Sequence, residues 1–381
     1  MIYFDQCSTS FPKAPGVSAR VKDFIDGGCL NAGRGSYSAA RAAEQLVYET
    51  RGLLAALFGF GKARNVIFTG GATQSLNMIL KGALKPGDHC VTTAAEHNSV
   101  LRPLAQLAKS GVSYDVAGCS PDGRLSISDL KNKIRRNTKM IMATHASNVC
   151  GTVLPAGEIG RICEAEGIFF ALDAAQTGGV IPLSISSLCA DALVFSGHKG
   201  LLAAPGVGGF IISDRLLEIT EPLISGGTGS FSHSADMPYL APDKFEAGTL
   251  NLAGVAALNE SVSFITERGV ARLRENENGL FGYFADEIKK IPGVRLAGYD
   301  YNNEGAERCA VAALDFINTD NGEAAGILDE KYGIMTRSGL QCAPLMHKAL
   351  GTFPRGVVRC SFGYKNTRAE VDFFLEALER L

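Results

Sequence analysis

Apolar residues gather in short continuous runs between about residues 60 and 215, and helix-period patterns separate these runs. Neighbouring residues of a strand point to opposite faces, so a continuous apolar run indicates a strand that is buried on both faces. The spacing of Leu76, Ile79, Leu80 and Leu84 is an example of the helical pattern between runs. We therefore expect a parallel or mixed sheet covered by helices on both faces. The predicted strands are 66–69, 139–144, 168–173, 192–196 and 208–213.

After residue 250 the pattern changes to one long helix followed by short strand-like segments. Pro292 and Gly293 end this helix, and Thr367 with Glu370 forms a capping box that opens the last helix. Such a mixture is typical of a smaller α+β unit. The residues on one face of the long helix are Val270, Leu273, Glu277, Leu280, Phe281, Phe284 and Ile288. The predicted strands are 294–296, 310–314, 334–337 and 357–361.

A chain of 381 residues is long for a single core, so two domains are expected. We place a large α/β domain at 14–255 and a small C-terminal α+β domain at 256–381. Residues 1–13 are expected to pack against the smaller domain.

The charge balance and the cysteine pattern exclude several classes of protein. A formal net charge of −2 gives no electrostatic case for binding nucleic acid or an anionic membrane. The N-terminus lacks a signal-peptide pattern, and no window of about 18 apolar residues could span a membrane. The ten cysteines show no CxxC or CxxH spacing, which indicates reduced thiols in a cytoplasmic protein and no metal site.

The segment Phe195-Ser196-Gly197-His198-Lys199-Gly200 places a lysine directly after a short apolar run. A lysine that forms an imine must spend time unprotonated, and partial burial lowers its pKa enough for this. By itself the string is more typical of a solvated loop lysine. Its context favours the chemical interpretation, because Asp173 ends the preceding apolar run and a pyridoxal phosphate site needs such a carboxylate.

The segment Gly70-Gly71-Ala72-Thr73 lies between a predicted strand and a predicted helix. Free N–H groups at the helix N-terminus, near Ala72, and the Thr73 hydroxyl suit a phosphate group. The same four residues could equally form a plain tight turn. A lysine such as Lys199 further along the chain favours the phosphate interpretation.

Three more side chains have a place in such a site. Asp173 would pair with a protonated pyridine nitrogen, which makes the ring an electron sink. Gln176 could hydrogen-bond the phenolic oxygen of the ring. His97 could stack on the ring face and pass protons, although a single histidine at a helix start is more often structural. Asp173 and Gln176 fall at or just after predicted strand ends, as do Thr73, Ser196, His198 and Lys199, and open α/β sheets bind ligands at this edge.

Several motifs occur together and in the order in which one known family has them. On these motifs the chain resembles the class V aminotransferase family, and within it the cysteine desulfurases and selenocysteine lyases. The resemblance covers nearly the whole chain. The motifs are Glu96-His97-Asn98, His145-Ala146-Ser147-Asn148-Val149-Cys150-Gly151-Thr152, Leu172-Asp173-Ala174-Ala175-Gln176, Phe195-Ser196-Gly197-His198-Lys199 and Phe245-Glu246-Ala247-Gly248-Thr249.

The resemblance implies an architecture and a cofactor. It implies the α/β fold-type I architecture of pyridoxal-phosphate-dependent transferases, with a mostly parallel seven-stranded sheet and a smaller α+β domain. It also implies a homodimer with sites at the subunit interface and pyridoxal 5'-phosphate on Lys199. Thr73, Ser196 and His198 would hold the phosphate, and Thr249 would reach in from the other subunit. Asn148 would lie beside the ring or the substrate.

Two further segments resemble parts of the SUF-type (group II) desulfurases. The segment 337–344 is similar to their catalytic-cysteine segment, which makes Cys342 the nucleophile and places Arg337 near the substrate. Arg359 resembles the arginine that clamps the substrate carboxylate, for which a guanidinium fork is well suited. Arg34 resembles a position near the partner subunit's substrate. SUF-type members commonly carry two histidines just before the cysteine, whereas the segment Leu340-Gln341 stands here.

These features predict a cysteine desulfurase that converts L-cysteine to L-alanine and leaves the sulfur on Cys342 as a persulfide, for transfer to an acceptor protein. One alternative is a selenocysteine lyase acting on L-selenocysteine. Another is a different class V activity, such as a transaminase, epimerase or C–S lyase, in which Cys342 is incidental. A catalytically silent partner of a sulfur carrier is a further alternative, against which the intact set Lys199, Asp173 and Arg359 argues.

Overall fold

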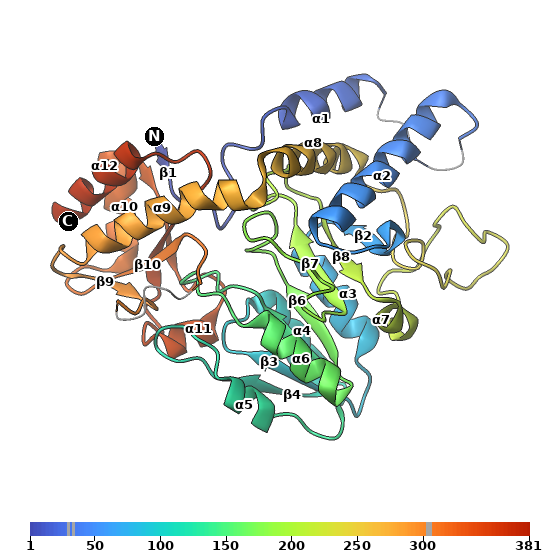
Figure 1. The fold of residues 1–381 in the computed structure, drawn as a ribbon, viewed down its shortest axis with the longest axis horizontal. Coiled ribbons are helices and arrows are strands. Elements are labelled where there is room, and N and C mark those ends of the chain that lie inside the picture. Colours follow the sequence, from blue (N-terminus) through green and yellow to red (C-terminus); the bar gives the residue numbers. More distant parts are fainter. Residues whose placement is uncertain (29–30, 33–34, 302–306) are drawn as a thin grey trace.

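The computed structural model describes residues 1–28, 31–32, 35–301 and 307–381. A seven-stranded sheet of strand order β2-β8-β7-β6-β5-β3-β4 forms its centre (Figure 1). β8 runs antiparallel to both neighbours, and the other pairs are parallel. The prediction of a mostly parallel sheet is therefore confirmed. The strands are β2 (Val66–Thr69), β3 (His89–Thr93), β4 (Ser113–Ala117), β5 (Thr138–Thr144), β6 (Phe169–Asp173), β7 (Ala192–Ser196) and β8 (Gly208–Ile212).

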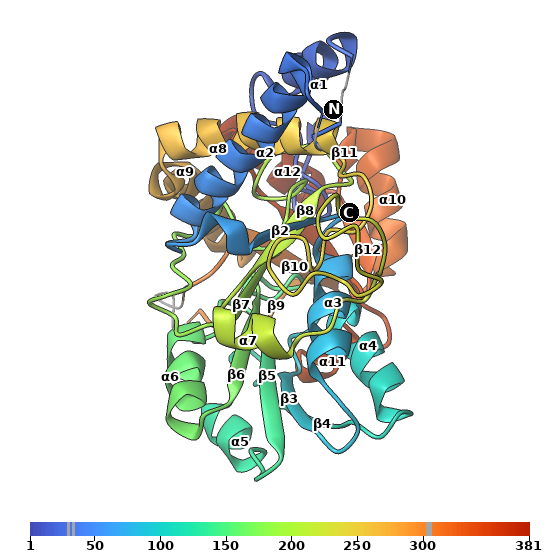
Figure 2. The same cartoon turned by 90° about the vertical axis from the view of Figure 1, so that its right-hand side faces the viewer.

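Helices cover both faces of this sheet, and Figure 2 shows α5 and α6 on one side with α3 and α4 on the other. Met140 and Met142 of β5 pack in the core beneath α3 and α4, whereas Ile141 and Ala143 pack in the opposite core. This alternation explains why the strands read as continuous apolar runs. In the described part of the chain no helix is long and apolar enough to cross a bilayer. The helices are α1 (Val17–Asp26), α2 (Ser38–Leu57), α3 (Ala72–Ala83), α4 (Asn98–Ala108), α5 (Ile127–Asn132), α6 (Ala156–Glu166), α7 (Asp214–Ile219) and α8 (Leu252–Arg268).

A second core lies beneath a smaller antiparallel sheet of strand order β12-β13-β10-β9. Aromatic side chains fill it: the rings of Phe284 and Phe374 stack at 5.4 Å, and Phe4 stacks on Phe374 at 5.2 Å. The long helix predicted from the apolar stripe is confirmed as α9. The elements of this part are α9 (Val270–Ile288), β9 (Val294–Ala297), β10 (Val311–Phe316), α10 (Asn321–Tyr332), β11 (Ile334–Met335), β12 (Arg337–Gly339), α11 (Pro344–Ala349), β13 (Val357–Ser361) and α12 (Arg368–Glu379).

Helix α8 spans the predicted boundary between residues 255 and 256. Its buried residues Val262 and Ile265 pack in the core beside the large sheet, beyond that boundary. The division of the chain into domains 14–255 and 256–381 stays a prediction.

The N-terminal segment 1–13 contacts both parts of the molecule. Its strand β1 (Ile2–Tyr3) pairs in parallel with β11, and Phe4 enters the smaller core. Farther along, the His198 carbonyl accepts hydrogen bonds from Thr9 Oγ1, from Ser10 N and Oγ, and from Lys13 Nζ, at 2.9 to 3.1 Å. The segment therefore holds the peptide that precedes Lys199.

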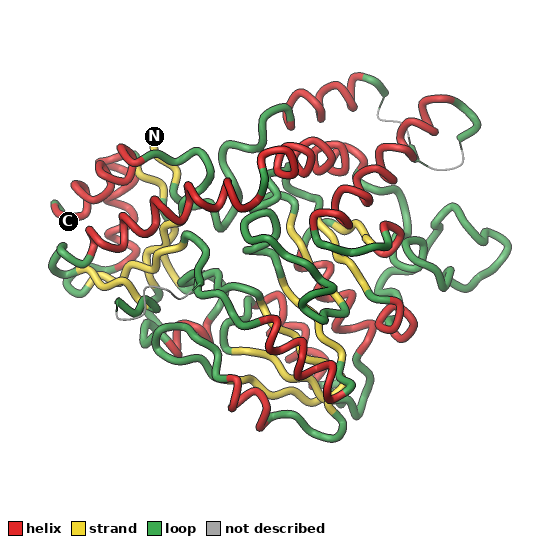
Figure 3. Tube along the Cα trace, in the orientation of Figure 1, coloured by secondary structure: helices red, strands yellow, loops and turns green. Residues whose placement is uncertain are grey.

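A long loop connects α7 to α8, and Figure 3 shows this stretch as irregular chain. Tyr239 and Leu240 in this loop are exposed. Thr249 lies near its end, where it lines a hollow of about 620 Å³ with Tyr48 of α2.

Glu277 places a carboxyl group in the apolar stripe of α9. Its side chain lines a chamber of about 50 Å³ together with Cys309 and Lys199. Burial raises the pKa of Glu277 to about 8, and Arg274 one turn earlier opposes this shift. The ordinary value is 4.5, so the unfolded chain ionises at this position before the folded protein does.

We expect the Glu277→Gln variant to gain stability relative to the native protein as the pH rises from about 4.5 to about 8. Below this pH window the carboxyl group of Glu277 is protonated in both the folded and the unfolded state. Within it the unfolded state ionises while the folded state keeps its proton, so the native protein loses stability, by at most roughly 5 kcal/mol. Glutamine has no such proton and escapes this loss.

Urea unfolding of both proteins near pH 5 and pH 8 measures the difference in their free energies of unfolding, which is called the gap below. Glu275→Gln, at an exposed position of the same helix, serves as the control and should show no widening gap. A Glu277→Gln gap that stays constant with pH would contradict the prediction.

Candidate active site

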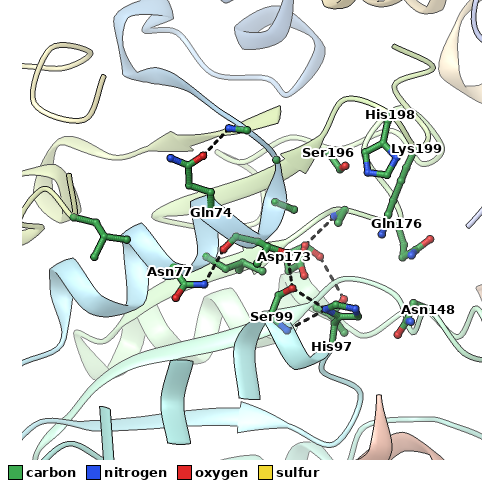
Figure 4. Close-up of a pocket in the computed structure, with 18 residues that line it drawn as sticks. Gln74, Asn77, His97, Ser99, Asn148, Asp173, Gln176, Ser196, His198 and Lys199 are labelled. Carbon is green, nitrogen blue, oxygen red and sulfur yellow. Dashed lines mark hydrogen bonds between the residues drawn. The ribbon is translucent and has the colours of Figure 1, made fainter. Parts of the chain in front are cut away.

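The carboxyl ends of β2, β3, β5, β6 and β7 meet at one edge of the large sheet, and a cavity of about 580 Å³ opens there (Figure 4). This is the edge at which open α/β sheets bind ligands. Cys342, Arg337, Arg359 and Thr249 do not line it. Nine of the residues predicted for the site line the cavity, namely Ala72, Thr73, His97, Asn148, Asp173, Gln176, Ser196, His198 and Lys199.

Lys199 follows the end of β7, and its side chain is partly buried and lines the cavity. Burial lowers the pKa of Lys199, while Asp173 and then Cys7 oppose the shift. The guanidinium groups of Arg359 and Arg337 lower the pKa further. An amine held in this state can act as a nucleophile towards an aldehyde or as a base.

Asp173 ends the neighbouring strand β6 and is 4% exposed. Burial raises its pKa, whereas the hydrogen bond that Oδ1 accepts from Ala175 N at 2.9 Å and the charge of Lys199 lower it. Because a buried carboxylate needs a partner, the Asp173 side chain suits a cationic nitrogen placed in the cavity.

The start of α3 forms the far end of the cavity. Gly71 has a φ of 145°, which side-chain-bearing residues rarely adopt, and this lets the chain turn from β2 directly into the helix. The Gly70 amide donates to Gln74 Oε1 and the Gly71 amide to Thr69 Oγ1. The amides of the first helical turn, which begins at Ala72, have no partner within the helix and can bind an anion.

His198 and Ser196 also line the cavity. Nδ1 of His198 is buried without a hydrogen-bond partner among the described residues. Burial lowers the pKa of His198 to about 4, and Lys199 and Lys13 add to the effect. A buried ring nitrogen of this kind calls for a partner, and a phosphate group bound in the cavity would supply one.

His97 begins α4 as its N-cap. Its Nδ1 accepts a hydrogen bond from Ser99 N at 3.0 Å, which leaves the ring proton on Nε2. Burial lowers the pKa of His97 to about 4, with further contributions from Lys199 and Arg337. The imidazole is therefore neutral near pH 7 and can both pack against a ring and exchange a proton.

Arg359 of β13 is 2% exposed and already has an internal carboxylate partner. Its Nη2 lies 2.7 Å from Asp5 Oδ1 and donates to Ser8 Oγ at 2.8 Å, while Nη1 donates to the Asn148 carbonyl at 3.0 Å. Nε is buried without a partner among the described residues. Arg337, which is exposed, donates to the same Ser8 Oγ at 2.9 Å. Both guanidinium groups thus converge on Ser8, where an incoming carboxylate would compete with Asp5.

We expect Asp5→Asn to destabilise the protein by about 3 kcal/mol, because it leaves the buried Arg359 without its carboxylate. A small carboxylate such as acetate should then stabilise the variant more than the native protein, since it can replace the lost group. Urea unfolding with and without acetate measures both effects, with the exposed Asp23→Asn change as the control. Equal stabilisation of variant and native protein by acetate would exclude carboxylate binding at Arg359.

Cys342 is exposed and lies next to the cavity rather than in its wall. Its carbonyl accepts a hydrogen bond at 2.7 Å from the amide of Asn98, which follows His97. Asn148 lines the cavity, but its Nδ2 donates to the Gln341 carbonyl at 2.6 Å. Its predicted contact with a ring or substrate stays a prediction.

Two predicted residues lie elsewhere. Thr249 lies in the loop before α8 and lines the separate hollow beside α2, so the predicted contact of Thr249 requires a second subunit. Arg34 lies outside the described residues.

The sequence patterns did not single out Asp5, Ser8 or Ser99. Ser99 Oγ lies 2.7 Å from Thr73 Oγ1 and 2.8 Å from His97 Nδ1, and so joins two residues of the site. The only signal for Asp5 and Ser8 is their position in a polar stretch that directly follows the apolar residues 2–4.

Comparisons with known proteins agree with this geometry. The model of the family described as aminotransferase class-V matches residues 2–374. A probable cysteine desulfurase of Methanothermobacter thermautotrophicus is 32% identical over 385 residues, which cover 100% of this chain and 94% of the relative. A cysteine desulfurase of Serratia proteamaculans is 31% identical over 390 residues, with coverages of 100% and 93%.

A solved structure is similar over the same length. The apo cysteine desulfurase of Thermococcus onnurineus is 31% identical and matches with a TM-score of 0.92, covering 100% of this chain and 94% of that one. The fold, the sheet edge at which the cavity opens and the family model all agree. The chain therefore belongs to the class-V aminotransferase family and has its fold-type I architecture.

Proposed function

We propose that this protein is a cysteine desulfurase that uses pyridoxal 5'-phosphate to convert L-cysteine to L-alanine and receives the sulfur on Cys342. One observation carries the proposal. Lys199, Asp173 and the start of α3 line one cavity, and the carbonyl of the exposed Cys342 accepts a hydrogen bond from the amide of Asn98, which follows the cavity residue His97. The curated relatives named cysteine desulfurase, at about 30% identity over the full chain, support the same activity.

The residues present fit pyridoxal phosphate. The amides near Ala72, together with Thr73, Ser196 and the unpartnered His198 Nδ1, would hold the phosphate. Asp173 would hold the ring nitrogen, and Lys199 would bind the aldehyde carbon. Gln176 lies beside Lys199 in Figure 4 and would hydrogen-bond the phenolic oxygen. When bound, the cofactor supplies an electron sink that stabilises negative charge at the substrate α-carbon.

The chain's own residues would then share the remaining work. Arg359, with Arg337 and Ser8, orients the substrate carboxylate. Lys199 would take the α-proton on Nζ, and the neutral His97 would pack against the cofactor ring and could pass a proton. Asn148 lines the cavity and would contact the substrate, while its Nδ2 donates to the Gln341 carbonyl of the cysteine segment.

Cys342 performs the sulfur transfer. Its thiolate forms a bond to the substrate sulfur while the bond from that sulfur to the β-carbon breaks. The electron pair of the broken bond stays with the substrate carbon, which takes up a proton and leaves as alanine. Because Cys342 is exposed, a protein acceptor could then take the sulfur from it.

A homodimer would complete the site. Thr249 and the exposed Tyr48 and Tyr239 lie away from their own cavity, which is the arrangement expected if they face a second copy. Thr249 and Arg34 would then act at the partner's site.

We further propose that the chain divides into a large domain, 14–255, and a small domain, 256–381, and that the protein is cytoplasmic.

Incubation of the pyridoxal-phosphate-loaded protein with L-cysteine tests the proposal. We expect alanine to form and one sulfur atom to be added to Cys342, detected by mass spectrometry of the peptide. Comparing kcat/KM for L-cysteine and L-selenocysteine separates a desulfurase from a selenocysteine lyase. If neither substrate gives alanine, both the desulfurase and the selenocysteine lyase activity are excluded.

A further inference from the structure

Cys342 lies in a turn with an unusual backbone. Gln341 has a φ of 49° and Cys342 a φ of 57°, both in the left-handed region that side-chain-bearing residues rarely adopt. Two such residues in succession persist only where surrounding contacts fix them. The contacts that hold this turn therefore decide where the Cys342 thiol is presented.

The Gln341 side chain supplies one of these contacts. The residue is 4% exposed, and its Nε2 donates to the Arg337 carbonyl at 2.9 Å and to the Gly339 carbonyl at 3.4 Å. Both partners are acceptors, so the amide nitrogen must face them and Oε1 must point away. Oε1 is buried without a partner among the described residues. The side chain thus ties the turn back to β12. A side chain that carries only hydrogen-bond acceptors could not form these two bonds.

The backbone of the turn is held from the other side. The Gln341 carbonyl accepts from Asn148 Nδ2 at 2.6 Å, and the Cys342 carbonyl accepts from Asn98 N at 2.7 Å. Asn148 lines the cavity and Asn98 directly follows His97. The turn is therefore fixed between β12 and the cavity wall.

We propose that Gln341 is the positioning residue for Cys342, and that its amide fastens the turn to β12 so that the thiol is presented in one fixed conformation beside the cavity. That this thiol accepts sulfur rests on the proposed function. The fastening itself does not depend on it.

Two substitutions isolate the amide. Gln341→Glu keeps the size of the side chain but replaces the donor with an acceptor that cannot bond to two carbonyls. Gln341→Gly also removes the bond, yet it tolerates the left-handed backbone better than any other residue. If backbone conformation alone mattered, the glycine variant would behave as the native protein. Gln106→Glu, at an exposed position of α4, is the matched control.

The first readout is hydrogen exchange of the apoprotein in the peptide covering residues 338–344. We expect exchange there to be about tenfold faster in both Gln341 variants, because the turn opens more often. The control should match the native protein. An exchange rate equal to that of the native protein, in either folded variant, would overturn the proposal.

The second readout is turnover of L-cysteine. We expect kcat to fall on the order of tenfold to hundredfold in both variants, because misplacing an attacking group by about 1 Å has effects of this size. KM should stay within about twofold, since neither variant changes the carboxylate contacts. Exchange of the α-hydrogen of L-alanine in D₂O needs Lys199 but not Cys342, and should proceed as in the native protein.

The two readouts separate the proposal from the proposed function. If the native protein forms no alanine from L-cysteine, the proposed function fails, while the hydrogen-exchange comparison still decides whether Gln341 fastens the turn. Native kcat in the glycine variant, or equal losses of cysteine turnover and alanine exchange, would show that Gln341 does not position the thiol.

Discussion

Lys199→Ala is expected to lose tightly bound pyridoxal phosphate, and with it the visible absorbance of the loaded protein. Turnover of L-cysteine should fall by more than about 10³-fold, because the variant lacks both the amine that binds the aldehyde and the base that takes the α-proton. Absorbance after gel filtration and alanine release measure the two losses.

Lys244→Ala is a matched control for this variant. Lys244 is a buried lysine whose pKa burial also lowers, but its Nζ donates to the Leu217 carbonyl away from the cavity. We expect this control to keep the visible absorbance. Borohydride reduction should attach the cofactor to Lys199 in the native protein and in the control. A Lys199→Ala protein that still holds the cofactor through gel filtration would show that another group anchors it.

Cys342→Ser should lose sulfur transfer while keeping the chemistry at the α-carbon. The serine hydroxyl has nearly the same size as the thiol but does not accept sulfur, so we expect alanine release from L-cysteine to fall by about 10²-fold or more. Lys199 and Asp173 are untouched, and exchange of the α-hydrogen of L-alanine should continue. This pattern would show that Cys342 acts in sulfur transfer and not in the chemistry at the α-carbon.

Cys189→Ser tests whether any accessible thiol would serve. Cys189 is partly exposed but lies near Glu164, at a distance from the cavity residues. Its replacement should leave alanine release unchanged. Full cysteine turnover in Cys342→Ser would exclude Cys342 as the sulfur acceptor and favour another class V activity.

The sequence predicted those parts of the fold whose signal is local. Buried strands such as β6 and β7 appear as continuous apolar runs, and α9 appears as an apolar stripe. β3 and β4 did not stand out, because polar residues make up much of them. In β3 the side chains of His89, Thr92 and Thr93 are buried, and His89 Nδ1 and Thr92 Oγ1 form hydrogen bonds with β5 that no local pattern reveals.

The candidate site was predictable where its residues follow strand ends. Lys199, Asp173 and His97 each stand in a short motif, and these motifs indicate one chemistry when they are taken together. Asp5 and Ser8 were not predictable, because their partner Arg359 is more than 350 positions away in the chain. For Gln341 the sequence showed only an absent histidine, whereas the structure shows what its amide bonds to.

The converging hydrogen bonds on the His198 carbonyl have a mechanical consequence. A protein shortened to begin at Ala14 would lose these donors, and it would also lose Phe4 from the aromatic core and Asp5 from Arg359. Affinity tags are therefore better placed after Leu381. In the folded protein residues 1–13 connect the smaller core to the His198 carbonyl. A rotation of the smaller sheet would therefore also displace the peptide group that precedes Lys199.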